Sequence, residues 1–505
     1  MMQHLLVLPV LLPLLSGLLM LVKRDATRLP RRGIALVSTA LLVVVTVIMV
    51  LESRSGEISY YALGDWQPPF GIILVLDRLS ALMVCLTSIL ALGSVAYACA
   101  GDDRKGSNFH GLFQLQLMGI NGAFLTGDLF NLFVFFEVLL IASYSLLMHG
   151  GGKDRTQAGF HYVALNLAGS AMFLIALGVL YGTLGTLNMA DMAQRVAMLD
   201  VDRLGLVEAG AFLLLVVFGL KAAILPLYFW LPRAYASAPA PVAALFAIMT
   251  KVGIYAILRV YTLIFGESAG ELANFVQPWL WWFALATLAL GGVGVLSARD
   301  LRTQVAYLII ISVGTLLVGV SMNREAPIAA LLYYMIHTTL VSGGLFLLAD
   351  AISEQRGKAG ARIVPGRGVT QPSLLGFFYF LGAVTVIGLP PLSGAIGKAL
   401  LLDSAQPGEQ MWLWPLLLLS SLAGIVAMGR SGSTIFWKAK PGDSDGPRLQ
   451  PAMLAGLILL LGASPVLSLL AGPITEFTDA SATQLLDPGQ YAQSILLQNA
   501  TGDGS

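Results

Sequence analysis

Residues 129–148 read LFNLFVFFEVLLIASYSLLM, an apolar stretch that carries a single charged side chain, Glu137. A helix needs ~20 mostly apolar residues to cross the hydrocarbon core of a bilayer. Stretches of this kind recur along the whole chain, which is 57% hydrophobic and only 11% charged, whereas soluble domains carry about 25% charged residues. The sequence therefore predicts an all-α, polytopic membrane protein.

We expect about fourteen membrane-spanning helices on the ~20-residue criterion. Their predicted ranges are 4–22, 34–51, 78–99, 110–127, 129–148, 158–182, 207–230, 239–265, 278–297, 304–322, 327–349, 372–402, 411–429 and 452–472. The first range has no preceding basic residue and no clear small-residue cleavage site, so we interpret it as a retained helix rather than a signal peptide.

Lysine and arginine concentrate in alternate loops between these ranges, above all in 23–32, 356–367 and 430–448. Basic residues mark the cytoplasmic side of membrane proteins. We therefore expect these loops in the cytoplasm and both termini outside, with an acidic external C-terminal tail.

Composition also argues against several other classes of protein. Cys85 and Cys99 are the only cysteines, and both lie in one apolar stretch, so a disulfide framework or a cysteine-rich metal site is not expected. The formal net charge of +1 gives no field that would attract nucleic acid. We expect no metal, no cofactor and no enzymatic chemistry in this chain.

Four ionisable side chains fall well inside predicted spans, namely Glu137, Lys221, Lys251 and Lys398. A charge at the bilayer centre costs roughly 2.5–3.5 kcal/mol, so such residues normally face a bundle interior or a water-filled path. Arg259 lies near the outer end of its span, where it could extend to the headgroups. We expect it to anchor the outer face and to take no part in proton transfer, since a guanidinium stays protonated.

Glu137 and Lys221 are expected to lie on facing helices near the middle of the membrane, within a few ångströms of each other. Burial and a nearby carboxylate act on a lysine in opposite senses, so the protonation of Lys221 would depend on Glu137. This dependence suits a proton relay, although a purely structural ion pair would show the same residues.

Two predicted spans contain proline beside a buried lysine. Lys221 precedes Pro226 in FGLKAAILPLYFWLP (218–232), and Lys398 follows Pro390 and Pro391 in VIGLPPLSGAIGK (386–398). Proline interrupts the helical hydrogen bonds, and broken helices at membrane depth need protein or water around them. They are the seventh and twelfth spans, so they suggest an inverted five-helix repeat.

We therefore divide the chain into four parts. These are N-terminal helices in 1–109, a first repeat in 110–265, a second inverted repeat in 278–429, and a cytoplasmic loop, last helix and external tail in 430–505.

The histidines give weaker signals. His337, in the middle of its span, could join the relay because its ordinary pKa is ~6.5, or it could be a hydrogen-bonded core residue. His110, His149 and His161 fall at cytoplasmic ends of spans, where they could mark a proton entrance, although headgroup-level placement explains them most simply.

Three motifs together resemble the D subunit of Mrp-type multisubunit sodium/proton antiporters, a relative of the antiporter-like proton-pumping subunits of respiratory complex I. They are NGAFLTGDLFNLFVFFEVLLIASY (121–144), FGLKAAILPLYFWLPRAYASAPAPVAALFAIMTKVGIYAILRV (218–260) and GLPPLSGAIGK (388–398). By this resemblance the proton relay comprises Glu137, Lys221, Lys251, His337 and Lys398.

The resemblance also implies a bacterial cell membrane, other subunits of a hetero-oligomeric complex (a large A subunit and small membrane subunits), and H⁺ with Na⁺ as transported ions. Two positions depart from relatives: Tyr228 stands where complex I subunits often have histidine, and Ser342 where some relatives have a second lysine. His337 would therefore carry more of the central relay.

Three functions remain open on the sequence. The first is a cation/proton antiporter subunit that exchanges cytoplasmic Na⁺ for external H⁺. The alternative is a proton-pumping subunit of an NADH:quinone oxidoreductase or membrane-bound hydrogenase. The third is a scaffold bundle with unused charges, which does not explain why five ionisable residues lie at unfavourable depth.

Overall fold

The computed structural model describes residues 2–22, 28–439 and 446–496, and the chain is almost entirely helical over these ranges. Within them, eleven helices are long and apolar enough to cross a membrane. They are α3 (Arg28–Ser53), α4 (Arg78–Ala98), α6 (Leu129–Leu147), α7 (Lys153–Leu184), α9 (Leu204–Ala222), α11 (Ala240–Leu263), α12 (Gln277–Ser297), α13 (Leu301–Met322), α14 (Glu325–Gln355), α17 (Pro407–Gly432), and α18 (Pro451–Leu461) together with α19 (Ala463–Leu469).

Shorter helices lie in the other predicted ranges or between them. They are α2 (Leu8–Val22), α5 (Phe109–Leu125), α10 (Trp230–Ser237), α15 (Pro372–Ile387) and α16 (Ser393–Asp403). The prediction of an all-α, polytopic membrane protein is confirmed.

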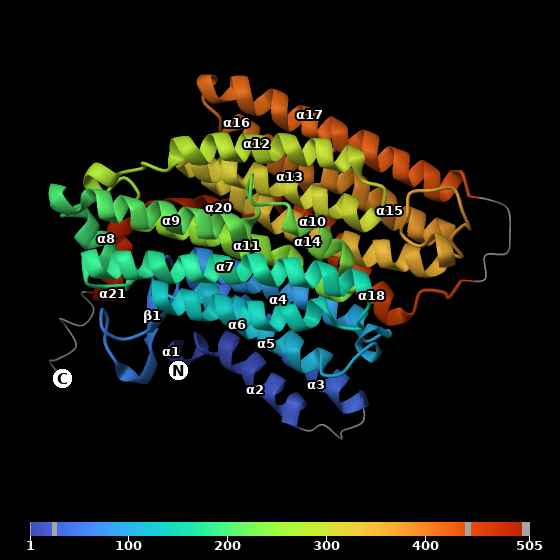
Figure 1. Ribbon diagram of the computed structural model, residues 1–505, viewed down its shortest axis with the longest axis horizontal. Coiled ribbons are helices and arrows are strands. Elements are labelled where there is room, and N and C mark those ends of the chain that lie inside the picture. The colour runs from blue at the N-terminus through green and yellow to red at the C-terminus, as the bar shows by residue number, and fades with distance from the viewer. Residues whose placement is uncertain (1, 23–27, 440–445, 497–505) are drawn as a thin grey trace.

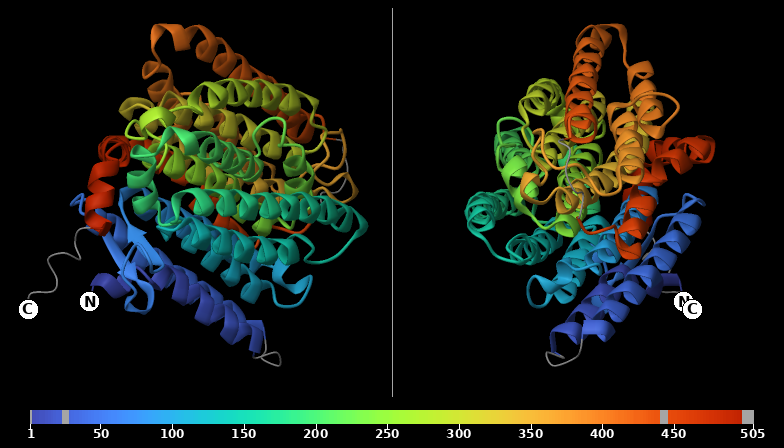
Figure 2. Two further views of the ribbon diagram at one scale, coloured as in Figure 1. Left: turned by 60° about the vertical axis from the view of Figure 1, so that its left-hand side comes forward. Right: turned by 90° about the vertical axis from the view of Figure 1, so that its right-hand side faces the viewer.

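The long helices run side by side along the longest axis of the molecule, as expected of helices that cross the same bilayer (Figure 1). The hairpin of α2 and α3 lies at one margin of the bundle, and α17 lies at the opposite margin (Figures 1 and 2). Between them α6, α7, α9, α11, α14 and α16 form a row in which each helix packs on the next. This row crosses the bundle at right angles to the helix axes.

Burial follows position in this bundle. Every residue of α11 is buried, and α14 is buried over most of its length, whereas α3 and α7 expose one apolar face. A helix that is apolar all round belongs inside a bundle or a membrane. Lys251 on α11 and His337 on α14 therefore occupy the centre of the molecule.

Both spans that carry proline beside a buried lysine are broken. α9 ends at Ala222, Ala223 has a left-handed backbone (φ 63°), and the chain becomes helical again only at Trp230. α15 ends at Ile387, Gly388 has a φ of 88°, and α16 begins at Ser393.

A broken helix at membrane depth needs partners for the backbone groups that lose their helical hydrogen bonds. Side chains supply such partners at the first break. The Trp230 indole donates to the carbonyl of Leu220 (3.1 Å), and Thr287 Oγ1 accepts from the N–H of Leu225 (2.9 Å).

Several elements were not predicted. Strands β1 (Ser59–Ala62) and β2 (Ile73–Leu76) form an antiparallel hairpin, with Tyr60 opposite Val75. Helix α8 (Met189–Ala197) lies between α7 and α9 in the sequence.

The predicted C-terminal tail is folded over much of its length, because α20 (Ala471–Leu485) and α21 (Pro488–Leu496) pack on the bundle. Its last residues, 497–505, lie outside the described residues, as do 23–27 and 440–445 of the predicted basic loops.

Candidate functional site

Glu137 lies near the middle of α6 and is half-buried. Helix α6 begins after Asp128, whose carboxylate accepts the backbone N–H of Asn131 (2.8 Å). The Glu137 carboxylate accepts a hydrogen bond from the Ser170 hydroxyl of α7. This serine was not singled out from the sequence.

Lys221 lies at the end of α9, immediately before the break, and is 6% exposed. Its ammonium donates to Asn166 Oδ1 of α7 (2.9 Å), and Asn166 Nδ2 donates in turn to the carbonyl of Tyr162 (2.8 Å). Gly169 lets the helices approach, since a Cβ there would lie 2.7 Å from Leu220 Cδ2.

The expected direct ion pair between Glu137 and Lys221 is therefore replaced by contacts through α7. The two charges interact electrostatically, but each is hydrogen-bonded to α7 rather than to the other. Asn166 and Ser170 are four residues apart and so lie on one face of that helix. The signal in the sequence was an amide and a hydroxyl one turn apart within an apolar span.

Lys251 lies on the central helix α11 and is 0% exposed. Among the described residues its Nζ has no hydrogen-bond partner, and neither has the neighbouring Thr250 Oγ1. Close by on the same helix, a Cβ on Gly253 would lie 2.5 Å from the backbone N of Ala222 and 2.9 Å from the carbonyl carbon of Lys221. This close approach packs the Gly253 face of α11 against the broken end of α9.

His337 is held by two hydroxyls that sequence reasoning missed. Its Nδ1 hydrogen-bonds Ser393 Oγ of α16 (2.8 Å), and Ser393 Oγ hydrogen-bonds Ser464 Oγ of α19 (2.8 Å). The other ring nitrogen, Nε2, has no partner among the described residues. His337 therefore keeps one nitrogen available, and both Lys251 and Lys398 interact with it electrostatically.

Lys398 follows the second break and is 7% exposed. Its ammonium donates to the carbonyl of Ile387 at the end of α15 (2.6 Å) and to Ser421 Oγ of α17 (2.8 Å). A cavity of about 530 Å³ borders it, lined by residues 387–391 and by α16 and α17. The lysine thus donates a hydrogen bond to a carbonyl that the break leaves without its helical partner.

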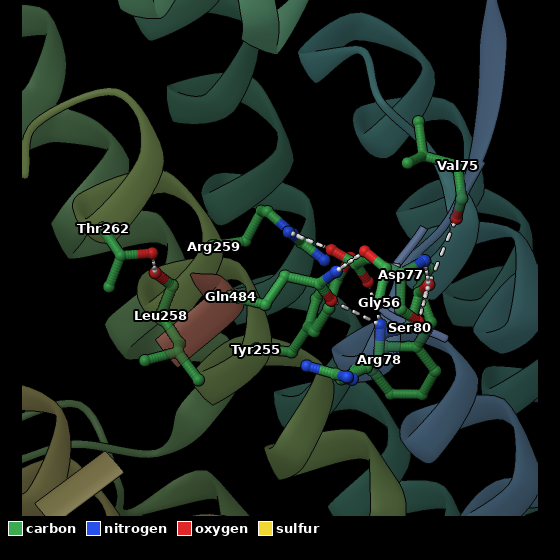
Figure 3. Close-up of polar contacts among 11 residues, drawn as sticks. Gly56, Val75, Asp77, Arg78, Ser80, Tyr255, Leu258, Arg259, Thr262 and Gln484 are labelled. Carbon is green, nitrogen blue, oxygen red and sulfur yellow. Dashed lines mark hydrogen bonds and ion pairs between the residues drawn. The ribbon is translucent and has the colours of Figure 1, made fainter. Parts of the chain in front are cut away.

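Arg259 does not anchor the outer face, and this expectation is wrong. It is 4% exposed and forms an ion pair of 2.6 Å with Asp77, the N-cap of α4, which is equally buried (Figure 3). Its guanidinium also lies over the rings of Tyr255 and Tyr491. Burial alone would raise the pKa of the Asp77 carboxyl, but the charge and hydrogen bond of Arg259 lower it.

Neighbouring contacts tie this pair to the C-terminal helices. The Arg78 side chain donates to the carbonyls of Ser53, Arg54 and Ala480. Its backbone N–H donates to Gln484 Oε1 (Figure 3). This end of the bundle is therefore closed by α4, α11 and α20 together.

A second group of charges lies at the other end of the bundle. Asp350 pairs with Arg302 and accepts from the Tyr97 hydroxyl (3.2 Å), while Asp102 pairs with Lys105. Burial and the nearby Asp350 raise the pKa of Asp102 despite Lys105. Asp350 is a buried acid inside α14, which extends beyond its predicted end. Glu137 is therefore not the only acidic residue inside a long apolar helix of the described chain.

The three histidines at the ends of predicted spans differ in their surroundings. His110 Nε2 meets Asp103 (3.2 Å), His149 Nε2 meets the carbonyl of Asp102 (3.0 Å), and both rings are 6% exposed. His161 is exposed and bonds only within its own helix. Burial lowers the pKa of His149, which lies beyond the end of α6.

The described residues contain no group of three or more His, Cys, Asp or Glu side chains that could hold a metal ion. Cys85 and Cys99 are free thiols.

Comparison with known proteins gives a consistent match over the chain. The family described as "NADH:quinone oxidoreductase/Mrp antiporter, TM" matches residues 126–424. The D subunit of a probable K⁺/H⁺ antiporter from Rhizobium meliloti (strain 1021) is 42% identical, with 98% of each chain covered. The D subunit of a Na⁺/H⁺ antiporter from Bacillus subtilis (strain 168) is 36% identical over 98% of this chain and 100% of that protein.

Among solved structures, a chain of the Mrp complex from Dietzia sp. DQ12-45-1b superposes with a TM-score of 0.88. It is 27% identical, and the match covers 98% of this chain and 99% of that one.

Proposed function

Because the chain belongs to the family of NADH:quinone oxidoreductase and Mrp antiporter membrane subunits, we propose that it is the D-type subunit of a multisubunit antiporter. The complex exchanges protons for a monovalent cation across a bacterial cell membrane. The chain acts together with other membrane subunits, as relatives named as antiporter subunits do.

One observation carries this proposal. Glu137, Lys221, Lys251, His337 and Lys398 belong to successively packed helices of the row α6, α7, α9, α11, α14 and α16, and Asn166 and Ser170 belong to α7, which supports a relay along this row. A single channel along the membrane normal does not need ionisable groups on so many helices. A lateral proton path does.

Proton transfer along this row needs only proton exchange between neighbouring groups. A proton that reaches Glu137 removes the negative charge that balances Lys221. Lys221 then releases a proton toward Lys251, which passes it to the free nitrogen of His337, and His337 passes it to Lys398. Water that satisfies Lys251 Nζ, Thr250 Oγ1 and His337 Nε2 would bridge the gaps, since these buried atoms otherwise lack partners among the described residues.

The identity of the cation stays a separate prediction. The sequence predicts Na⁺, and the relative from Bacillus subtilis is named for Na⁺/H⁺ antiport, whereas that from Rhizobium meliloti is named for K⁺/H⁺. Exchange measured with each cation in turn distinguishes the two.

Topology and internal symmetry are further parts of the proposal. We place in the cytoplasm the basic end of the bundle, which carries the Arg32–Asp103 and Arg302–Asp350 ion pairs. Both termini then lie outside. The stretches 110–265 and 278–429 would be inverted repeats, each with one broken helix. The left-handed residues Ala223 and Gly388 at corresponding breaks support this.

Antiport is favoured over redox-driven proton pumping because full-length relatives at 36–42% identity are named antiporter subunits. The test is reconstitution of the whole complex with the wild-type chain or with Glu137→Gln, following proton and cation movements separately. We expect Glu137→Gln to lose proton-coupled cation movement.

Glu208→Gln serves as the matched control, because Glu208 lies near the start of α9, more than three turns from Lys221 at its end. Cation/proton exchange without any electron donor supports antiport. Proton movement only in the presence of a redox substrate would contradict it.

A further inference from the structure

Gln304 is a buried amide that the proposed proton row does not use. It lies near the start of α13 and is 0% exposed. Neither its Nε2 nor its Oε1 has a hydrogen-bond partner among the described residues. Buried side-chain amides are nearly always hydrogen-bonded, either to protein groups or to ordered water. Gln304 therefore points to a buried water site.

A small cavity borders this amide. Its volume is about 10 Å³, close to the ~10–15 Å³ that one water needs. Side chains of α13, α14, α15 and α17 line it, among them Leu345, Leu348 and Tyr379. Most of these walls are apolar, whereas the Gln304 amide offers a water both donors and an acceptor.

The small cavity adjoins a wider one that reaches the end of the bundle. The wider cavity has a volume of about 640 Å³ and lies between α15 and α17. Tyr379 and Met428 line both cavities. The wider one extends to Ser373, near the start of α15, and to Trp437, beyond the end of α17. The amide of Gln304 thus lies close to the basic end of the bundle, which we place in the cytoplasm.

Two helices lead from the small cavity toward His337. Leu348 lies 11 residues after His337 on α14, which is about three turns or ~16 Å, so the two residues share one face of that helix. On α15, Tyr379, Gly382 and Thr385 follow each other at intervals of three residues. Thr385 lies ~9 Å along the helix from Tyr379.

Two further unpartnered polar atoms lie at that inner end. Thr385 is 1% exposed, and its Oγ1 has no hydrogen-bond partner among the described residues, as His337 Nε2 has none. Gly394 of α16 packs against both residues. A Cβ there would lie 2.0 Å from the carbonyl oxygen of Thr385 and 3.0 Å from His337 Nε2. Thr385 and the free nitrogen of His337 are therefore close neighbours.

Leu345 separates the two polar places. Its side chain lines the small cavity, and it also packs on α15, because a Cβ on Gly382 would lie 2.7 Å from Leu345 Cδ2. Gly382 is one turn before Thr385. Apolar constrictions of this kind gate the passage of water by dewetting.

We propose that Gln304 and Thr385 hold the water of an access path from the cytoplasmic end of the bundle to His337. Leu345 is the apolar gate of this path. When the gate is wetted, the water chain donates a proton to His337 Nε2, and His337 passes it to Lys398. This inference rests on the proposed function, since it adds an entrance to the same row.

Hydroxyl-radical footprinting of the assembled complex tests the water site, because radicals formed from a bound water modify the side chains that touch it. We expect Leu345 and Leu348 to be modified in the wild type, and Gln304→Leu to reduce their modification to the level of Leu317. Leu317 is the matched control, since it is 0% exposed on the same helix as Gln304 and lines neither cavity.

Gln304→Glu keeps a polar group of the same size and should retain the modification. Loss of modification in this variant as well would assign the effect to folding and overturn the role of the amide. Unmodified leucines in the wild type, or equal modification in Gln304→Leu, also overturn the water site.

Passive proton leak into proteoliposomes tests the gate. Leu345→Ala should raise the leak about tenfold, because a large apolar side chain no longer opposes wetting. Leu347→Ala is the matched control, since Leu347 is 0% exposed on the same helix and lines neither cavity. Adding Thr385→Val to Leu345→Ala should abolish the extra leak. Equal leaks from the two leucine variants overturn the gate, and a leak that Thr385→Val leaves unchanged overturns the passage by Thr385.

Neither measurement requires cation exchange, so the two proposals fail separately. A complex that shows the footprint but no cation/proton exchange loses the proposed function alone. A complex that exchanges cations for protons but leaves Leu345 and Leu348 unmodified loses only the access path.

Discussion

Asn166 is the residue that accepts a hydrogen bond from the Lys221 ammonium. A buried ammonium needs an acceptor, and Asn166 Oδ1 supplies it at 2.9 Å while its own amide is fixed by the Tyr162 carbonyl. Ser170, one turn further along α7, donates a hydrogen bond to the Glu137 carboxylate. Glu137 and Lys221 thus interact electrostatically and are each hydrogen-bonded to the same face of α7.

We predict that Asn166→Ala lowers the antiport rate about tenfold, because a hydrogen bond to a charged group contributes ~1.5–3 kcal/mol. Rates measured in everted membrane vesicles at equal complex content check this. Gln157→Ala removes an exposed amide from the same helix and should leave the rate unchanged. A wild-type rate for Asn166→Ala would show that α7 does not take part in the path.

The buried pair of Asp77 and Arg259 is a matter of stability rather than of transport. We predict that Asp77→Asn destabilises the protein by ~3–5 kcal/mol, since it leaves the Arg259 charge buried without its partner. Arg259→Lys keeps the charge and should leave most antiport activity.

The pH dependence of this effect has a definite sign. The pKa of Asp77 is lowered in the folded protein, so its stabilisation is complete above the ordinary value of ~3.9 and is lost only as pH falls through the folded value. Melting temperatures of wild type and Asp77→Asn should therefore differ equally at pH 6 and pH 8. Asp65→Asn, an exposed site, is the control, and a gap that closes between these pH values would contradict the assignment.

At the scale of elements, close backbone approaches at glycine border both breaks, the one after α9 and the one between α15 and α16. Gly253 of α11 meets the backbone of Lys221 and Ala222, and Gly394 of α16 meets the Thr385 carbonyl, where a Cβ would lie only 2.0 Å away. These contacts involve backbone atoms, which cannot rotate aside as side chains can.

We therefore predict that Gly253→Ala separates α11 from the break, costs about 1–3 kcal/mol through overpacking, and lowers antiport severely. Gly178→Ala is the matched control, since a Cβ on Gly178 of α7 meets nothing within 4 Å. Vesicle transport together with the melting temperature of the complex separates loss of function from loss of folding. Normal transport by Gly253→Ala would mean that the spacing of Lys251 and Lys221 does not matter.

At the scale of the whole molecule, the two halves of the row meet at the fully buried helix α11. Lys251 there has no hydrogen-bond partner among the described residues, with Lys221 before it and His337 after it in the packing order. A lateral path must pass through this residue, whereas two independent channels need not.

We predict that Lys251→Ala abolishes antiport while the complex still assembles, because the proton then has no carrier between α9 and α14. Assembly is measured by size-exclusion chromatography, and transport by proton and cation fluxes in proteoliposomes. Lys153→Ala, at an exposed position, should transport normally. Full antiport by Lys251→Ala would remove the lateral mechanism.

The sequence by itself determined the class of protein, the approximate positions of the helices and the ionisable residues at membrane depth. It could do so because length, apolarity, proline and isolated charge are local properties that the bilayer constrains strongly. The resemblance carried by residues 121–144, 218–260 and 388–398 pointed to the family to which the chain belongs.

Only the tertiary structure decided which polar groups meet. Asn166, Ser170, Ser393 and Ser464 are ordinary in sequence, since short polar side chains inside helices are common and their partners lie on other helices. The same limit explains the error on Arg259 and why Asp350 was not singled out: each charge is stabilised by a distant partner, Asp77 or Arg302, that no local pattern reveals. Contacts between helices depend on packing angles and on close approaches at glycine, and these arise only when the whole bundle is assembled.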